Sequence, residues 1–429
     1  MIEWVRYLSN TNSKRSAKWR YVIIALLLVI TIVGGFGYQV YTRSPANANS
    51  SSALEMSTAV SSELSVSQST ESANVSVGAD NGTQPTVPVT LSGAGIGVGG
   101  TLPASLFKVW STQIAFAFPA ITLKYSASAT KITKLVKGSI DFVTSDIPLT
   151  NAQFAATPGL IEMPETLGGV GITYNLSLLG LPNSTLLNFT PEVLVGIYFG
   201  QITQWNDPRI ATLNPTLKLP GNLITAVHRS DASGTTYAFT SYLSAVSPTW
   251  ATEVGYGSTI KWPADTFAAG IGAKGNAGVA AVIQKTAGAL GYVDINYALN
   301  NHLTFGAIRN AAGNYVAPSV QTIEWAAANA TVTNGTTGVQ LNLLNPPGQL
   351  SYPITYVTYL VLYKDMSKNS GITVYKAEAL ANFLRWSIHD GQQYAPDLLY
   401  APLPENIVSA DQQILTTLNY NGTPLPTSS

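Results

Sequence analysis

The strongest hydrophobic pattern in the sequence is an uninterrupted run near its N-terminus. Residues 21–38 read YVIIALLLVITIVGGFGY without one charge, which is long enough to span a bilayer as a helix. Basic residues precede the run, and none lies between Arg43 and Lys108, so the N-terminal end is expected to stay inside the cell. The pattern predicts a cytoplasmic segment over residues 1–20 and a transmembrane anchor or signal over residues 21–41. The length of the run, and the lack of a small-x-small cleavage motif directly after it, favour the anchor.

Residues 42–88 form a segment of a different kind. They are rich in Ser, Thr, Ala, Asn and Val and contain almost no aromatic side chain. Such a composition cannot bury enough apolar surface to offset the entropy that is lost on ordering. We therefore expect a flexible stalk that holds an extracytoplasmic body away from the cell membrane.

From residue 89 onward, apolar stretches of strand length alternate with amphipathic stretches of helical length, and no internal repeat is visible. A strand is predicted over residues 139–145, ending at Asp146. A second strand over residues 223–227 runs into HRSDASGTTYAFTSYL, which continues as a helix. A helix is also predicted to start at Thr101 and Pro103, with apolar residues at Leu102, Leu106, Val109, Ile114 and Ala117. The alternation is typical of an α/β domain over residues 89–429.

Composition and charge exclude several classes of function. Lys and Arg (22) balance Asp and Glu (22), and only 10% of residues are charged, so no basic surface for nucleic acid is expected. The chain has no cysteine, and its three histidines lie in separate segments, so we expect no disulfide, no metal site and no cofactor. Glycans on several sequons would place the body outside the cell. Nine sequons begin at Asn49, Asn74, Asn81, Asn175, Asn183, Asn188, Asn329, Asn334 and Asn421.

The segment from Arg229 to Thr235 carries the groups that an anion site needs. Ser233 and Thr235 supply hydroxyls, and the amides at the start of a helix favour negative charge. Arg229 can bind an oxyanion with two N–H groups, and Asp231 can hold its guanidinium in place. The same spacing also fits a plain helix cap with a surface ion pair, so the residue types leave both interpretations open.

HRSDASGTTYAFTSYL also resembles the signature loop of the periplasmic phosphate-binding proteins of phosphate ABC transporters, whose pattern is R-x-D-x-S-G-T before an aromatic-rich helix. LSGAGIGVGGTLPASLFKVW is similar to that family's opening strand, glycine turn and helix. GSIDFVTSDIPLT is similar to its strand that ends in Ser-Asp-x-Pro-Leu. Further matches are FTPEVLVGIYFGQITQWNDPRIATLNP, KGNAGVAAVIQKTAGALGYVDINYA and WSIHDGQQYAPDLLYAPLP. They follow the family's order from about Leu91 to Val408.

The resemblance implies a phosphate site whose residues can be placed one by one. The family's opening turn contributes a Thr and the next backbone amide, which fall on Thr101 and on Leu102, where the family usually has Phe. Its second donor falls on Ser128 in YSASATKIT, with Thr130 as the substitute because the family's glycines are replaced here. The acceptor aspartate, the guanidinium and the helix-start residues fall on Asp146, Arg229, Ser233, Gly234 and Thr235.

Asp146 has a physical role in this expected site. A carboxylate repels an anion unless a proton lies between them, and phosphate carries such a proton near neutral pH. Sulfate has no proton to donate, so it would leave a buried acceptor unpaired beside a like charge. The sequence therefore predicts selective phosphate binding.

Other functions are weighed against this one. A binder of another oxyanion such as sulfate, or an exported phosphatase, could use the same loop. A phosphatase would need a metal or a nucleophile, and no Gly-x-Ser-x-Gly elbow surrounds Ser233; His228 is expected as a strand-end residue. An adhesin would leave the ordered motifs unexplained. Sugar binding by exposed aromatics is disfavoured, because the tryptophans in family-like segments are predicted to pack: Trp110, Trp205, Trp262 and Trp386.

The predicted fold is α/β, a two-lobed periplasmic-binding-protein-like fold with mixed sheets and an interlobe cleft that holds the anion. Lobe 1 is expected over about residues 89–172 and 356–429, and lobe 2 over about residues 173–355. Anion contacts from both lobes would favour closure by hinge motion. The resemblance implies a non-enzymatic protein that captures inorganic phosphate and delivers it to an ABC permease driven by cytoplasmic ATPase subunits.

Overall fold

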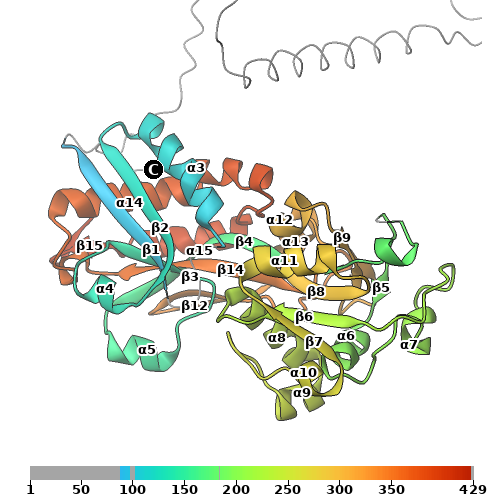
Figure 1. Ribbon diagram of the computed structural model, residues 1–429. Helices are drawn as coiled ribbons and strands as arrows, with labels where there is room; N and C mark the ends of the chain where they lie inside the picture. Colours follow the sequence, from blue (N-terminus) through green and yellow to red (C-terminus); the bar gives the residue numbers. More distant parts are fainter. Residues whose placement is uncertain (1–86, 97–101, 183, 427–429) are drawn as a thin grey trace, which may run out of the picture. The chain divides into compact units, whose positions relative to one another are not determined.

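The computed structural model describes residues 87–96, 102–182 and 184–426 (Figure 1). The chain divides into two compact units, residues 1–75 and 76–429. The predicted cytoplasmic segment, the predicted anchor and almost all of the predicted stalk lie outside the described residues. Within the described ranges, no helix combines the length and the apolar character that crossing a membrane requires.

One mixed sheet of eleven strands organises the described residues. Its main path is β2-β1-β3-β14-β4-β8-β6-β7, and β9, β12 and β13 pair beside it. The strands are β1 (Val89–Ile96), β2 (Ile121–Thr130), β3 (Phe142–Ser145), β4 (Leu160–Tyr174), β6 (Thr225–Arg229), β7 (Ala269–Ala273), β8 (Ala289–Asp294), β9 (Thr304–Phe305), β12 (Thr331–Gly335), β13 (Gly338–Asn342) and β14 (Thr355–Tyr363). Two small sheets contain β5 (Asn188–Phe189), β10 (Ala307–Arg309) and β11 (Tyr315–Val316), and β15 (Asn419–Tyr420) and β16 (Thr423–Pro424).

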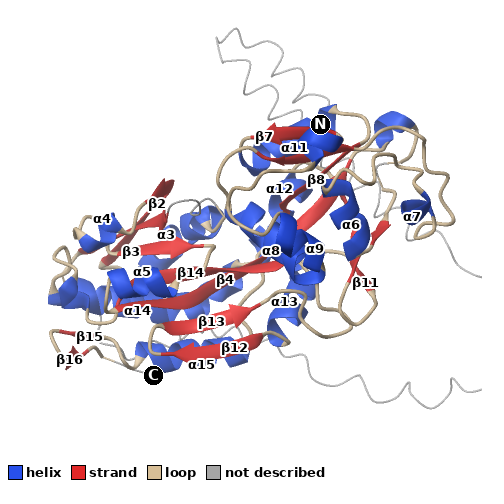
Figure 2. Cartoon of the chain, turned by 90° about the horizontal axis from the view of Figure 1, so that it is seen from below, coloured by secondary structure: helices blue, strands red, loops and turns tan. Residues whose placement is uncertain are grey.

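Strand β4 lies in the middle of this sheet and joins its two halves, β2-β1-β3-β14 and β8-β6-β7 (Figure 2). From Leu160 to Gly169 it runs antiparallel to β14, and from Val170 to Tyr174 it runs antiparallel to β8. The separate mixed sheets expected for the two lobes are therefore connected into one. All 15 residues of β4 are buried, so its sequence shows no alternation of polar and apolar side chains.

Helices pack against the faces of the sheet. They are α3 (Ala104–Ala117), α4 (Thr133–Val136), α5 (Asn151–Ala156), α6 (Pro191–Tyr198), α7 (Pro208–Ala211), α8 (Gly234–Val246), α9 (Pro248–Glu253), α10 (Ala264–Phe267), α11 (Gly275–Lys285), α12 (Ile295–Asn300), α13 (Val320–Ala328), α14 (Val374–Ile388) and α15 (Glu405–Leu415). Short 3-10 helices are η1 (Ser177–Leu179), η2 (Met366–Lys368), η3 (Asp390–Tyr394) and η4 (Pro396–Leu398). Helices α3 and α14 contact β2 and β1, whereas α8 and α11 contact β8.

The helix predicted after Pro103 is confirmed as α3, which buries Leu106 and Ile114 on one face. The two predicted strands are confirmed as β3, which starts three residues later than expected, and β6, which extends to Arg229. The helix predicted after the second strand is confirmed as α8, whose Phe239, Tyr242 and Leu243 are fully buried.

Aromatic side chains fill the core, as predicted for the tryptophans. Trp110 packs edge-on against Phe383 and Trp386 under α14. Trp262 packs against Tyr198 and Tyr292 beside β6 and β8. All four tryptophans of the family-like segments are buried, with at most 6% of their surface exposed, so none is free to stack on a sugar.

Candidate functional site

The turn between β6 and α8 holds most of the predicted anion-binding groups. Strand β6 ends at Arg229, and α8 begins at Gly234 after the N-cap residue Ser233. His228 precedes Arg229 at the end of the strand, as expected; its Nε2 lies 2.8 Å from Asp265 Oδ1, and its ring stacks on Trp262. These contacts tie the histidine into the fold.

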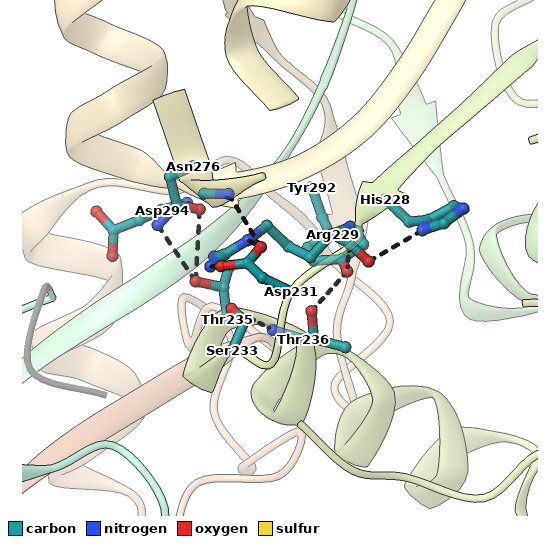
Figure 3. Close-up of polar contacts among 10 residues, drawn as sticks. His228, Arg229, Asp231, Ser233, Thr235, Thr236, Asn276, Tyr292 and Asp294 are labelled. Atoms are coloured by element: carbon teal, nitrogen blue, oxygen red, sulfur yellow. Dashed lines mark hydrogen bonds and ion pairs between the residues drawn. The ribbon is translucent and has the colours of Figure 1, made fainter. Parts of the chain in front are cut away.

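Arg229 and Asp231 form a close ion pair in this turn. The guanidinium donates from Nε to Oδ1 and from Nη2 to Oδ2 of Asp231, both at 2.7 Å. The Arg229 side chain is only 7% exposed, so the plain surface ion pair that the spacing also allowed does not describe it. Figure 3 shows the pair side by side, with Ser233, Thr235 and Thr236 below it in this view.

The charge of Asp231 is fixed by these contacts. Burial by itself raises the pKa of Asp231, but hydrogen bonds from Arg229 and from the Gly275 amide, together with the Arg229 charge, outweigh it and hold the pKa at about 2. Asp231 is therefore ionised at neutral pH and orients the guanidinium. No hydrogen bond within the described part of the chain takes up Nη1 of Arg229, which leaves it able to bind an anion.

The first turn of α8 presents further donors. The Ser233 hydroxyl accepts from the Thr236 amide at 3.3 Å, and the Ser233 amide donates to Ser258 O. Among the described residues, no hydrogen bond takes up the amides of Gly234 and Thr235. Two backbone N–H groups at the positive end of a 13-residue helix are thus available to a negatively charged ligand.

Asp146 meets this helix start from the other side. It follows β3 directly, is 4% exposed, and its Oδ1 accepts a hydrogen bond of 2.7 Å from Thr358 of β14. A Cβ atom added at Gly234 would lie 2.7 Å from Asp146 Cβ and 2.9 Å from its Oδ2. Only glycine permits this approach without displacing one of the two backbones. The structure therefore brings together Asp146 and the helix-start residues, which lie far apart in the sequence.

A cavity of about 310 Å³ opens beside Asp146, between α8 and β14. Tyr237 and Ser241 of α8 line one wall, and Tyr356 and Tyr359 of β14 line the other. Asp146, the predicted acceptor, is therefore one of the residues that line this cavity.

Buried polar side chains support the turn from behind. Thr236 and Tyr292 share a hydrogen bond of 2.7 Å, and the Tyr292 hydroxyl accepts from the Arg229 amide. Asn276 contacts the Thr235 hydroxyl and accepts from the Asp294 amide (Figure 3). These bonds hold the backbone of the turn against β8 and α11.

Comparison with known proteins shows the family to which this chain belongs. The family model for the PBP superfamily domain matches residues 60–390. The phosphate-binding protein PstS of Xylella fastidiosa (strain 9a5c) is 36% identical over 343 residues, which are 80% of this chain and 90% of that protein. PstS of Methanocaldococcus jannaschii is 34% identical over 325 residues, 72% of this chain and 82% of that protein. This chain belongs to the PstS family of phosphate-binding proteins. It is accordingly a binding protein and not an enzyme.

A solved structure shares the fold of this PstS-family chain. The high-affinity periplasmic phosphate-binding protein PfluDING, solved with phosphate bound at pH 8.5, aligns with a TM-score of 0.55. The alignment covers 76% of this chain and 93% of that one, at 17% sequence identity. The likeness supports the predicted α/β, periplasmic-binding-protein-like fold with a mixed sheet.

The remaining residues that the PstS resemblance singled out lie at the opening turn and in β2. Thr101 lies outside the described residues. Leu102 is buried, and its carbonyl accepts a hydrogen bond from the Tyr400 hydroxyl. Ser128, which was expected in a loop, lies instead in the last part of β2, where the register with β1 shifts. The side chains of Ser128 and Thr130 lie outside the described residues, so the choice between them stays a prediction.

Several residues that shape the site were not predicted. Thr358 bonds to Asp146, but its segment TYVTYLVLY simply reads as a buried strand. Asn276 and Tyr292 contact the turn but lie more than 40 residues after it in the chain. A local sequence pattern cannot predict contacts of this kind. In the described ranges, no three His, Asp or Glu side chains form a group that could hold a metal ion.

Proposed function

We propose that this protein is an extracytoplasmic substrate-binding protein that captures inorganic phosphate and delivers it to an ABC import permease. The relatives of the PstS family are named as phosphate-binding proteins, and the site carries the chemistry that such a ligand needs. The proposed ligands to phosphate are Thr101, Leu102, Ser128, Asp146, Arg229, Ser233, Gly234 and Thr235.

One observation carries the proposal: the buried carboxyl group of Asp146 lies directly against Gly234 at the positive end of α8, and the Arg229–Asp231 ion pair lies in the turn that leads into this helix. Two available amides and a guanidinium attract an oxyanion, while Asp146 rejects one that has no proton to donate. A site with donors alone would bind sulfate as well as phosphate. The carboxyl group of Asp146 among these donors is what makes phosphate the preferred ligand.

The lobes are proposed to run over about residues 89–172 with 356–429, and about residues 173–355. Strand β4 ends at Tyr174 and β14 begins at Thr355, close to both proposed boundaries, whereas β13 pairs with β4 at Glu162, in the first half of the sheet. Asp146 belongs to the first lobe and Arg229 with the start of α8 to the second. Phosphate that bridges them would stabilise the closed form, which is the form proposed to dock on the permease.

The N-terminal region completes the proposal. Residues 21–41 would anchor the protein in the cell membrane by a single span, and residues 42–88 would serve as the stalk, with the permease and its ATPase subunits as partners. Glycans are proposed on exposed sequons. Asn175 is not among them, because its side chain is buried and donates to the carbonyls of Ile283 and Gln284.

A retention assay tests the proposal. The purified protein should retain radiolabelled phosphate after rapid gel filtration, and excess unlabelled phosphate should remove the label. A chromogenic phosphate ester, incubated with the same sample, should stay intact because a binding protein captures phosphate without cleaving an ester bond. Loss of all label on the column, or steady release of the chromogen, would refute a phosphate-binding role.

A further inference from the structure

A second buried acid, Glu165, lies beside the proposed anion site. It sits at an irregularity of β4: Thr358 of β14 pairs with Thr166, whereas the next residue, Tyr359, pairs with Pro164. Glu165 is the extra residue between these pairs, and such a bulge changes the direction of a side chain. Thr358, which directly faces this bulge, is the residue that donates to Asp146.

The Glu165 carboxyl group is fully buried and lacks partners. None of its surface is exposed, and neither oxygen has a hydrogen-bond partner among the described residues. An ionised carboxylate without a partner is strongly disfavoured in such a place, whereas the neutral acid is far less so. Burial raises the pKa of Glu165 well above its ordinary value, and the negative charge of Asp146 raises it further.

No positively charged group is among those that act on Glu165 within the described part of the chain. Asp146 is the one charged group that acts on Glu165 within the described part of the chain. Further acids and phenols interact with these two acids or with one another: Tyr125 of β2, Asp294 at the end of β8, Tyr356 of β14 and Tyr400 after η4. The cluster can therefore accept one negative charge from an anion only if some of its acids stay neutral.

We propose that Glu165, the unpaired buried carboxyl group at the β4 bulge, is a second acid of the anion site, and that phosphate affinity depends on its proton. The inference rests on the proposed function. Loss of the proton would place another negative charge beside Asp146 and the bound anion, where the low dielectric strengthens repulsion. By thermodynamic linkage, a bound anion favours the protonated form of Glu165 in turn.

Glu162, three residues earlier on β4, provides a matched control. It is also fully buried, and burial raises its pKa to about 7 despite its hydrogen bonds. Its oxygens, however, accept from the Leu149 amide at 2.9 Å and from Gln340 Nε2 at 2.6 Å. Asp146 is not among the groups that act on it. Glu162 shares the strand, the burial and the raised pKa, and differs in its hydrogen bonds and in the lack of an effect from Asp146.

The test is a set of calorimetric phosphate titrations of the full chain from about pH 5 to about pH 9, for wild type, Glu165→Gln and Glu162→Gln. The ionisation of phosphate itself is common to all three proteins and cancels in ratios of Kd. The ratio of wild-type Kd to Glu165→Gln Kd should rise at least about tenfold across this range, because only the wild type gains a charge. The ratio for Glu162→Gln should stay flat.

Two further measurements separate the possible failures. Phosphate titrations in two buffers of different ionisation enthalpy give the number of protons that the protein takes up on binding. The wild type should take up more protons than Glu165→Met, a neutral variant of similar length. A flat Kd ratio for Glu165→Gln, or equal proton uptake, overturns the role of Glu165 while phosphate binding stands. No phosphate binding by the wild type at any pH overturns the proposed function and this inference with it.

Discussion

Phosphate binding should weaken at least about tenfold when Arg229 is replaced by alanine. The guanidinium is buried and held by Asp231 through two bonds of 2.7 Å, so it is already oriented before the anion arrives. Its loss removes charge-assisted hydrogen bonds to the anion and leaves the Asp231 carboxylate without its partner, close to the ligand. Tenfold corresponds to about 1.4 kcal/mol, which is a lower bound for this combination. Calorimetric titration with phosphate measures the effect.

A second arginine of the chain gives the control. Arg209 also binds an aspartate two residues away, with Nε 2.9 Å and Nη2 2.8 Å from the carboxylate oxygens of Asp207. Its side chain is 52% exposed and lies on α7, so Arg209→Ala should leave phosphate affinity unchanged. Equal affinities of Arg229→Ala and wild type, with both folded by circular dichroism, would show that the anion binds elsewhere.

Asp146→Asn should also weaken phosphate binding at least about tenfold, and it should reduce the preference for phosphate over sulfate. The side chain is buried against Gly234, where a carboxylate can accept the proton of phosphate. Asparagine keeps the shape but removes the charge and adds N–H donors, so the repulsion that excludes sulfate disappears. Paired titrations with phosphate and sulfate report both effects.

Asp141→Asn separates this role from a general loss of structure. Asp141 is also buried, at 1% exposed, but it pairs with Lys376 Nζ at 2.7 Å and accepts from the Ser92 amide. Removing its charge should lower the thermal stability and leave the phosphate affinity of the folded protein intact. Unaltered selectivity in Asp146→Asn would mean that discrimination arises from other groups.

The sequence predicts well those helices and strands whose ends are marked by a pattern within a few residues. The start of α8 at Gly234 after S-D-A-S, the end of β3 at Ser145 directly before Asp146, and the helix after Pro103 each follow from caps, turns or periodicity within a few residues. The placement of Arg229 beside Asp231 follows in the same way, because the two residues lie on one turn.

Other features depend on contacts that no short stretch of sequence encodes. Strand β4 is buried along its whole length, so it lacks the alternation that identifies a strand and gives no sign that it joins two half-sheets. The bond from Thr358 to Asp146 joins residues 212 positions apart. Ser128 extends β2 where a loop was expected; Ala and Thr in place of glycines restrict the backbone there. Such features appear only once the sheet is assembled.

The central claim is that an acid among oxyanion donors selects a ligand that still carries a proton. Calorimetric titration of the purified wild-type protein with phosphate and with sulfate, at one neutral pH, tests it most directly. The account predicts that phosphate binds at least about tenfold more tightly than sulfate. Comparable affinities for the two anions would contradict it.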